Sequence, residues 1–236
     1  MGVSNLTIYD EAKIDFEDIH FSPENKTALT RLLKEFKHIE ALSKYGLTVD
    51  NKILLYGHTG CGKTTTAKAI AKHIGKKTYS IDLSTIISSR LGETSKNVAT
   101  VFKKAAHEKA VLFIDEFDYL GASRNYNKKD SAEMQRLVNS IIQLIDFYPS
   151  DALLIAATNF SEVIDSAILR RFQLKLKFEL PSKEGLDTYY DSLLRAFPNQ
   201  YHQFSRIYDV SYAEAKDHLH QAIKTQIIKD EEEKLQ

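Results

Sequence analysis

The chain lacks several features that mark specialised classes of protein. Its one cysteine, Cys61, cannot form a disulfide within the chain. Four prolines and nine glycines are too few for long disordered linkers. The sequence has neither a run of about 20 apolar residues nor a basic start followed by an apolar stretch. We therefore expect no membrane span and no secretion, and predict a cytoplasmic protein.

Net charge is also absent. Thirty-two basic side chains balance thirty-two acidic ones, so no overall field attracts the protein to nucleic acid or to an anionic membrane. The eight histidines form no cluster with zinc-ligand spacing. The hydrophobic content of 43% is ordinary for a folded chain, and 236 residues suffice for one α/β domain with a small appendage.

Five short apolar segments are typical of strands, at residues 53–56, 78–82, 111–115, 152–158 and 174–178. The first four lack strict alternation of apolar and polar residues, as strands buried on both faces do. The last alternates apolar residues with lysine, as at the edge of a sheet. Because the intervening segments are long enough for crossover helices, we predict a three-layer α/β fold with a parallel five-stranded sheet between helices.

Helix signals flank these segments. The tripeptide SPE at residues 22–24 is typical of a helix start and precedes the first strand. Beyond the last strand, residues 183–197 and 210–229 have helical spacing and no further core strand is evident. We therefore predict an α/β domain over residues 1–180 and a small helical lid over residues 181–236.

Residues 57–64, GHTGCGKT, satisfy the phosphate-loop pattern G-x-x-x-x-G-K-S/T between a predicted strand and a predicted helix. Glycines let the backbone wrap a phosphate, and N–H groups at the helix N-terminus supply positive charge. We expect Lys63 to reach the β and γ oxygens of ATP and the Thr64 hydroxyl to bind Mg²⁺. Cys61 is either a small residue at a free position of the motif or a reactive thiol. The expected nucleotide-binding residues here are Gly57, His58, Thr59, Gly60, Cys61, Gly62, Lys63, Thr64 and Thr65.

Asp115 and Glu116 end the third predicted strand, downstream of the phosphate loop. In this setting we expect Asp115 to hold Mg²⁺, usually through water, and Glu116 to orient and polarise the attacking water. A lone aspartate at a strand end is often a helix cap or a turn former, but two adjacent acids after a buried strand favour the catalytic role. Asp118 and Arg124 are also explained as caps or bridges of the loop.

Further segments resemble AAA+ ATPases, in the order that this family has them. AATN at residues 156–159 resembles the sensor strand, ILRRF at 168–172 the arginine-finger segment, and FEDI at 16–19 the segment that contacts adenine. With the two motifs above, the resemblance extends from about Phe16 to about residue 229, nearly the entire chain.

The resemblance implies roles for five more residues. Asp18 and Ile19 would contact the nucleotide, and Asn159 would help position the attacking water. Arg170 and Arg171 would reach the γ-phosphate bound by a neighbouring subunit and stabilise charge in the transition state. Taken alone, Asn159 is explained as a turn residue and the arginines as charges that complement a helix dipole.

Within the family, the chain is most similar to the AAA subgroup that includes katanin and spastin. The shared features are LRRF, the GET after Arg90 and Leu91, and the lack of a sensor-two arginine. The resemblance implies a hexameric ring that pulls polypeptide through a pore with a loop carrying an aromatic residue. Here Arg90 holds the aromatic position, and arginine favours carboxylates, phosphates or stacked rings. A second pore-facing loop, residues 123–129, is basic and suits an acidic peptide or single-stranded nucleic acid, or is a solvated loop.

We therefore predict an ATPase that binds Mg-ATP between the domain and the lid. It would form a homo-oligomeric ring and couple hydrolysis to the remodelling of an unidentified protein partner. A second interpretation is an ATP-dependent switch or scaffold that regulates one partner without threading it. A third, a nucleic-acid-associated helper, is disfavoured by the neutral charge. The lack of an N-K-x-D signature counts against a small GTPase, and a small-molecule kinase leaves AATN and LRRF unexplained.

Overall fold

The computed structural model describes residues 15–87, 91–121 and 128–234. The chain forms two compact units. The first unit contains the residues up to Gly57 together with Lys63–Lys177, and the second contains His58–Gly62 together with Phe178–Gln236. The boundary between Lys177 and Phe178 lies close to the end of the last strand.

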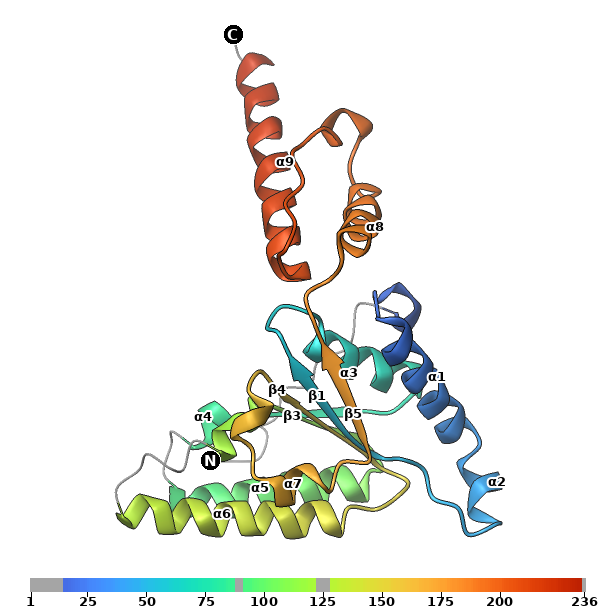
Figure 1. The fold of residues 1–236 in the computed structure, drawn as a ribbon, viewed down its shortest axis with the longest axis vertical. Helices are drawn as coiled ribbons and strands as arrows, with labels where there is room; N and C mark the ends of the chain where they lie inside the picture. Colours follow the sequence, from blue (N-terminus) through green and yellow to red (C-terminus); the bar gives the residue numbers. More distant parts are fainter. Residues whose placement is uncertain (1–14, 88–90, 122–127, 235–236) are drawn as a thin grey trace. The chain divides into compact units, whose positions relative to one another are not determined.

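A parallel five-stranded sheet lies at the centre of the first unit (Figure 1). Its spatial order is β2-β3-β4-β1-β5, which confirms the predicted fold class. The alternating segment predicted to form an edge does so as β5, and β2 is the other edge. The strands are β1 (Lys52–Gly57), β2 (Thr78–Asp82), β3 (Val111–Asp115), β4 (Leu153–Thr158) and β5 (Leu174–Phe178).

Helices cover both faces of this sheet. On one face Leu54, Leu112 and Leu154 pack in a single core with apolar residues of α5 and α6. Their strand neighbours point to the opposite face, where Ile53 and Leu55 are fully buried. The helices of the first unit are α1 (Pro23–Lys37), α2 (Ile39–Ser43), α3 (Lys63–His73), α4 (Leu83–Ile87), α5 (Leu91–His107), α6 (Lys128–Asp146) and α7 (Ser166–Leu169).

Helix α1 begins where the SPE tripeptide predicts. The side-chain oxygen of Ser22 accepts a hydrogen bond from the backbone N–H of Asn25 at 3.2 Å, and Pro23 occupies the first helical position. The Asn25 side-chain amide donates to the carbonyl of Lys177 at 2.8 Å, which ties the start of α1 to β5. The apolar side chains of α1, led by Leu29 and Leu32, are buried.

The second unit is mainly a helix pair, α8 (Lys183–Leu194) and α9 (Tyr212–Lys234), around a small core of its own. Tyr190 is fully buried in that core, and its hydroxyl donates to the carbonyl of Ile207 at 3.2 Å. The segment between the helices is anchored by Arg206, which forms ion pairs with Asp187 and Asp191 of α8. Helix α8 ends three residues before the predicted end at 197, and α9 continues beyond the predicted end at 229.

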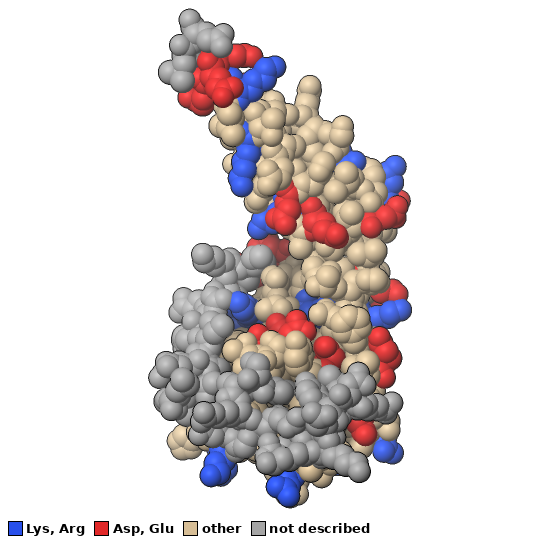
Figure 2. Space-filling model, turned by 90° about the vertical axis from the view of Figure 1, so that its left-hand side faces the viewer, with Lys and Arg blue, Asp and Glu red and all other residues tan. Residues whose placement is uncertain are grey.

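The face shown in Figure 2 carries both basic and acidic side chains, as the balanced composition leads one to expect. In the described part of the chain, every helix is too short or too polar to cross a lipid bilayer.

Candidate functional site

The carboxyl ends of three neighbouring strands lie on the same side of the sheet, and each of these ends carries one of the sequence motifs. The phosphate loop follows β1, Asp115 ends β3, and Asn159 comes directly after β4. Because β4 pairs with both β1 and β3, its carboxyl end lies between the other two motifs. The register places the ends of β1 and β4 side by side, since Tyr56 of β1 lies opposite Thr158 of β4. Ligands of open parallel sheets bind beyond the carboxyl ends of the strands.

The phosphate loop has the backbone conformation that its glycines permit. Gly57, Gly60 and Gly62 have φ values of 123°, 70° and 96°, which other residues adopt only at a cost. Lys63, the first residue of α3, is only 8% exposed, and its Nζ donates to the carbonyl oxygen of Gly57 at 2.8 Å. The ammonium group is therefore held at the last residue of β1, where the loop begins.

The two predicted metal ligands lie next to each other. The hydroxyl of Thr64 donates to Oδ2 of Asp115 at 3.0 Å, and Oδ1 of Asp115 accepts from the backbone N–H of Glu116 at 3.0 Å. A hydroxyl and a carboxylate beside a phosphate-binding loop are a donor set that suits Mg²⁺, which keeps several waters and takes few protein ligands. The residues present therefore fit this ion.

Glu116 follows with a strained backbone. It has φ 52° and ψ 45°, the left-handed region, and it directly precedes the turn of 3₁₀ helix at Phe117–Leu120. Burial raises the pKa of its carboxyl group, and the nearby carboxylates of Asp118, Asp115 and Asp82 raise it further, against a smaller opposite effect of Lys63. A carboxylate with a raised pKa is a better proton acceptor, as a group that activates water must be.

A hydrogen bond that the sequence did not predict joins β4 to the loop after β3. The hydroxyl of Thr158, which is 1% exposed, donates to Oδ1 of Asp118 at 2.6 Å and accepts from the backbone N–H of Phe160 at 3.0 Å. These bonds hold the chain on both sides of Asn159. Asp118 thus bridges the loop to β4, which is one of the two structural roles expected for it from the sequence.

The second unit supplies a contact to its own part of the phosphate loop. The backbone N–H of Ala213, in the first turn of α9, donates to the carbonyl oxygen of Gly60 at 3.1 Å. Ser211 and Glu214 form a reciprocal cap just before and within this turn, with Oε2 of Glu214 accepting from the Ser211 N–H and hydroxyl at 2.8 Å. The spacing S-x-x-E at 211–214 is a sequence signal for such a cap, but not for its contact with Gly60.

This contact makes Gly60 hard to replace. A Cβ atom at position 60 would lie 2.6 Å from Oγ of Ser211, so Gly60→Ala adds a collision to the cost of a positive φ. We expect Gly60→Ala to weaken binding of a fluorescent ATP analogue about tenfold or more, measured by titration. Gly75→Ala is the matched control, because Gly75 has φ 65° and open space around it.

The control should lose only about 1 kcal/mol of unfolding free energy in a urea titration and bind the analogue normally. Adding Ser211→Ala to Gly60→Ala removes the shortest contact and should restore part of the binding. If Gly60→Ala binds the analogue as tightly as Gly75→Ala does, the contact with Ser211 has no role.

The two candidate finger arginines differ sharply in their surroundings. Nε and Nη2 of Arg171 donate to the two carboxylate oxygens of Asp146 at 2.7 and 3.0 Å, and Nη1 donates to the carbonyl of Ala167. Arg170 is exposed at the end of α7, and Nε donates to the carbonyl of Ser166 at 3.2 Å. Among the described residues no carboxylate pairs with Arg170. Arg170 is therefore the freer of the two to reach another molecule.

The other predicted nucleotide-binding residues lie at the end of a 3₁₀ turn and in the phosphate loop. Asp18 is exposed and Ile19 half-buried at the end of the 3₁₀ turn Phe16–Asp18, while His58 donates its backbone N–H to the carbonyl of Phe178 at 2.8 Å. Cys61 is buried. Arg90 and residues 123–127 of the predicted pore loops lie outside the described residues.

Comparison with known proteins identifies the class. The model of the "ATPase family associated with various cellular activities (AAA)" matches residues 53–180, which run from the first strand to the end of the sheet. The chain belongs to this AAA family. It is also 34% identical over 240 residues to an uncharacterized AAA family ATPase, y4kL, of Sinorhizobium fredii, across 96% of this chain and 72% of that protein.

Other relatives are longer proteins, of which this chain matches a part. The chain is 32% identical to a proteasome-activating nucleotidase of Methanopyrus kandleri and 30% identical to an ATP-dependent zinc metalloprotease FtsH of Syntrophus aciditrophicus. These matches cover 76% and 84% of this chain but only 43% and 28% of the relatives' own lengths. Among solved structures, the FIGL-1 AAA domain superposes with a TM-score of 0.68 at 25% identity, over 84% of this chain and 67% of that one. The same domain is known in complex with ADP.

Proposed function

We propose that this protein binds Mg-ATP and hydrolyses it to ADP and phosphate. The observation that carries the proposal is the 3.0 Å hydrogen bond between Thr64 of the phosphate loop and Asp115 at the end of β3. It brings together two segments that lie far apart in the sequence, with Lys63 and Glu116 beside them. Binding of ADP by the related FIGL-1 domain supports a nucleotide as the ligand.

Each residue has a chemical task in this proposal. Backbone N–H groups of the loop and the Lys63 ammonium would hold the β- and γ-phosphates, and Asp18 and Ile19 would contact the base. Mg²⁺ near Thr64 and Asp115 would neutralise charge on the phosphate oxygens. Glu116 would accept a proton from the water whose oxygen forms the new bond to the γ-phosphorus, while ADP leaves with the electrons of the broken bond. Asn159 would hold that water in line.

We propose further that active sites are shared between subunits of a ring. The exposed guanidinium of Arg170 lies at the end of a short helix and is available to a neighbouring molecule. An arginine supplied by a neighbour stabilises the charge that develops on the transferred phosphoryl group. Another relative, the 26S proteasome subunit RPT4 of Saccharomyces cerevisiae, is by its name part of a larger assembly.

The substrate class we propose is protein. The names of the relatives, a metalloprotease and a proteasome-activating nucleotidase, describe ATPases that serve protein turnover. The balanced composition, with thirty-two basic and thirty-two acidic side chains, gives no support to a nucleic-acid partner. Hydrolysis would then remodel a bound polypeptide.

The test is the ATPase rate per subunit as a function of protein concentration, with light scattering to follow assembly. We expect the ATPase rate per subunit to rise with protein concentration, together with the average mass of the assemblies measured by light scattering, since an isolated subunit lacks its neighbour's arginine. Lys63→Ala should abolish nucleotide binding and serves as the blank. A rate per subunit that stays constant while the protein remains monomeric would refute the proposal of shared active sites. An assembled protein without ATPase activity would refute the proposed ATP hydrolysis.

A further inference from the structure

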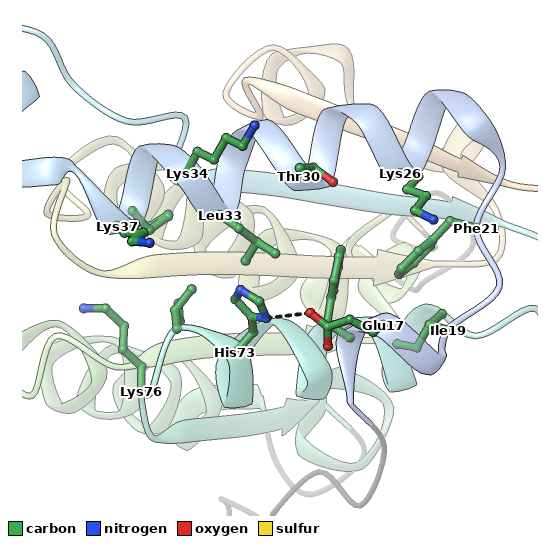
Figure 3. Close-up of a pocket in the computed structure, with 13 residues that line it drawn as sticks. Glu17, Ile19, Phe21, Lys26, Thr30, Leu33, Lys34, Lys37, His73 and Lys76 are labelled. Carbon is green, nitrogen blue, oxygen red and sulfur yellow. Dashed lines mark ion pairs between the residues drawn. The ribbon is translucent and has the colours of Figure 1, made fainter.

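A cavity lies in the first unit between α1, the 3₁₀ turn at residues 16–18 and the C-terminal end of α3 (Figure 3). Its volume is about 570 Å³, within the range of binding pockets for small ligands. None of the phosphate-loop residues 57–64 lines it, whereas Ile19, which would contact the base of ATP, does. The cavity therefore adjoins the proposed base-binding segment but does not include the phosphate loop.

Its floor is apolar. Phe16 and Phe21 contact each other with ring centroids 5.1 Å apart, and Leu33 and Phe36 of α1 add apolar surface. Phe21 is only half-buried, so part of its side chain is accessible from outside. An aromatic or branched aliphatic side chain from another molecule would find van der Waals partners here and leave water.

Its rim is basic. Lys26, Lys34 and Lys37 are exposed, and among the described residues no carboxylate lies within ion-pair distance of any of them. In the described part of the chain Glu17 is the one acid that lines the cavity, and its Oε1 lies 3.5 Å from Nδ1 of His73. The rim thus has a surplus of positive charge that the described part of the chain leaves uncompensated.

The lysines are spread along a line. Lys26, Thr30, Lys34 and Lys37 recur at helical spacing, so they follow one stripe of α1. At a rise of about 1.5 Å per residue, Lys26 and Lys37 lie about 16 Å apart along the helix. Figure 3 shows Lys26 at one end of the cavity, beside Phe21, and Lys37 and Lys76 at the other. A single phosphate or carboxylate cannot pair with both ends.

Lys76 marks the far end as a fixed cation. Its Nζ donates to the carbonyl oxygens of Lys109 and Asp151 at 2.6 and 2.7 Å and lies 6.0 Å from the centre of the Phe36 ring. An extended peptide advances about 3.3 Å per residue, so about five residues cover the distance from Lys26 to Lys37. The cavity and its rim match such a peptide better than they match a compact anion.

We propose that this cavity binds a short acidic peptide segment of a partner protein. The segment would lie along α1 with carboxylates facing Lys26, Lys34 and Lys37, and one aromatic or aliphatic side chain would enter between Phe21 and Leu33. This site gives the protein a means of recruiting a partner that does not depend on the pore segments. It is independent of ATP hydrolysis, so it stands or falls separately from the proposed function.

The probe is the fluorescein-labelled pentapeptide DEFDE, and binding is measured by fluorescence anisotropy. We expect saturable binding that Lys26→Glu with Lys34→Glu weakens about tenfold or more, because two attractive charges become repulsive. The matched control is Lys216→Glu with Lys224→Glu, which makes the same change of net charge on exposed positions of α9. The control should bind the probe as the wild type does.

Four further measurements test the proposal. Replacing the phenylalanine of the probe by alanine should weaken binding at least fivefold, and equal binding would mean unspecific charge attraction. Lys63→Ala should lose ATP and keep the probe, whereas loss of both would place the peptide in the nucleotide site. A thymidine oligonucleotide that binds with the same dependence on Lys26 and Lys34 would overturn the peptide assignment. A change in oligomeric state in the Lys26/Lys34 variant, without probe binding to the wild type, would assign the cavity to a second copy of the chain.

Discussion

Glu116→Gln should lower the rate of ATP hydrolysis by about 10²–10⁴-fold while ATP binding remains, because an amide cannot accept the proton of the attacking water. The change is nearly isosteric and removes one negative charge from a crowded group of acids. Nucleotide affinity should therefore stay the same or increase. Single-turnover hydrolysis and titration with a fluorescent ATP analogue measure the two effects separately.

The control for this variant is Asp82→Asn, at the end of β2. Asp82 lies opposite Asp115 in the sheet register, and its carboxylate accepts hydrogen bonds from Ser84 and Thr85. The substitution makes the same change of charge, and the amide oxygen can still accept hydrogen bonds. Hydrolysis should change by no more than a few fold. An equal loss in both variants would mean that the rate depends on local charge rather than on proton transfer to Glu116.

Arg170→Ala should reduce ATPase activity of the assembled protein about a thousandfold or more without weakening nucleotide binding. The arginine is exposed and makes a single hydrogen bond to its own helix, so its loss should leave the unfolding free energy nearly unchanged. Mixing Arg170→Ala subunits with Glu116→Gln subunits should restore activity. Rescue requires that an intact active site meet an intact arginine of its neighbour.

Arg171→Ala provides the contrast. This arginine binds both carboxylate oxygens of Asp146, and both side chains are partly exposed, so the ion pair is worth about 1 kcal/mol or less. We expect a small loss of stability that Asp146→Asn reproduces. If Arg171→Ala lowers the ATPase rate and Asp146→Asn lowers it equally, Arg171 acts by positioning α7. If mixtures of Arg170→Ala with Glu116→Gln stay inactive while Arg171→Ala mixtures recover, the assignment of the two arginines is reversed.

The fold could be predicted because its signals are local. Three strands, at 78–82, 111–115 and 174–178, have the predicted bounds. The proximity of Thr64 and Asp115 followed as well, because parallel strands bring their carboxyl ends to one edge of a sheet. Their roles in catalysis remain predictions.

What the sequence could not give depends on contacts between distant positions. Nothing near Gly60 indicates that Ala213 will donate to its carbonyl, and nothing near Arg171 indicates a partner at Asp146. The basic stripe of α1 and the phenylalanines just before it can be read from the sequence. Only the fold brings His73 and Lys76 to line the same cavity.

Because residues 58–62 belong to the second unit, the chain connects the two units at more than one point. The backbone crosses between the two units three times, at Gly57–His58, Gly62–Lys63 and Lys177–Phe178. A body joined by one linker can turn freely, whereas a body joined at three points can turn only if the backbone angles at all three change together. Two of these joints are glycines with positive φ, in the very loop that would grip the phosphates. In the proposed function, a nucleotide bound in that loop would restrict the backbone angles at two of the three joints.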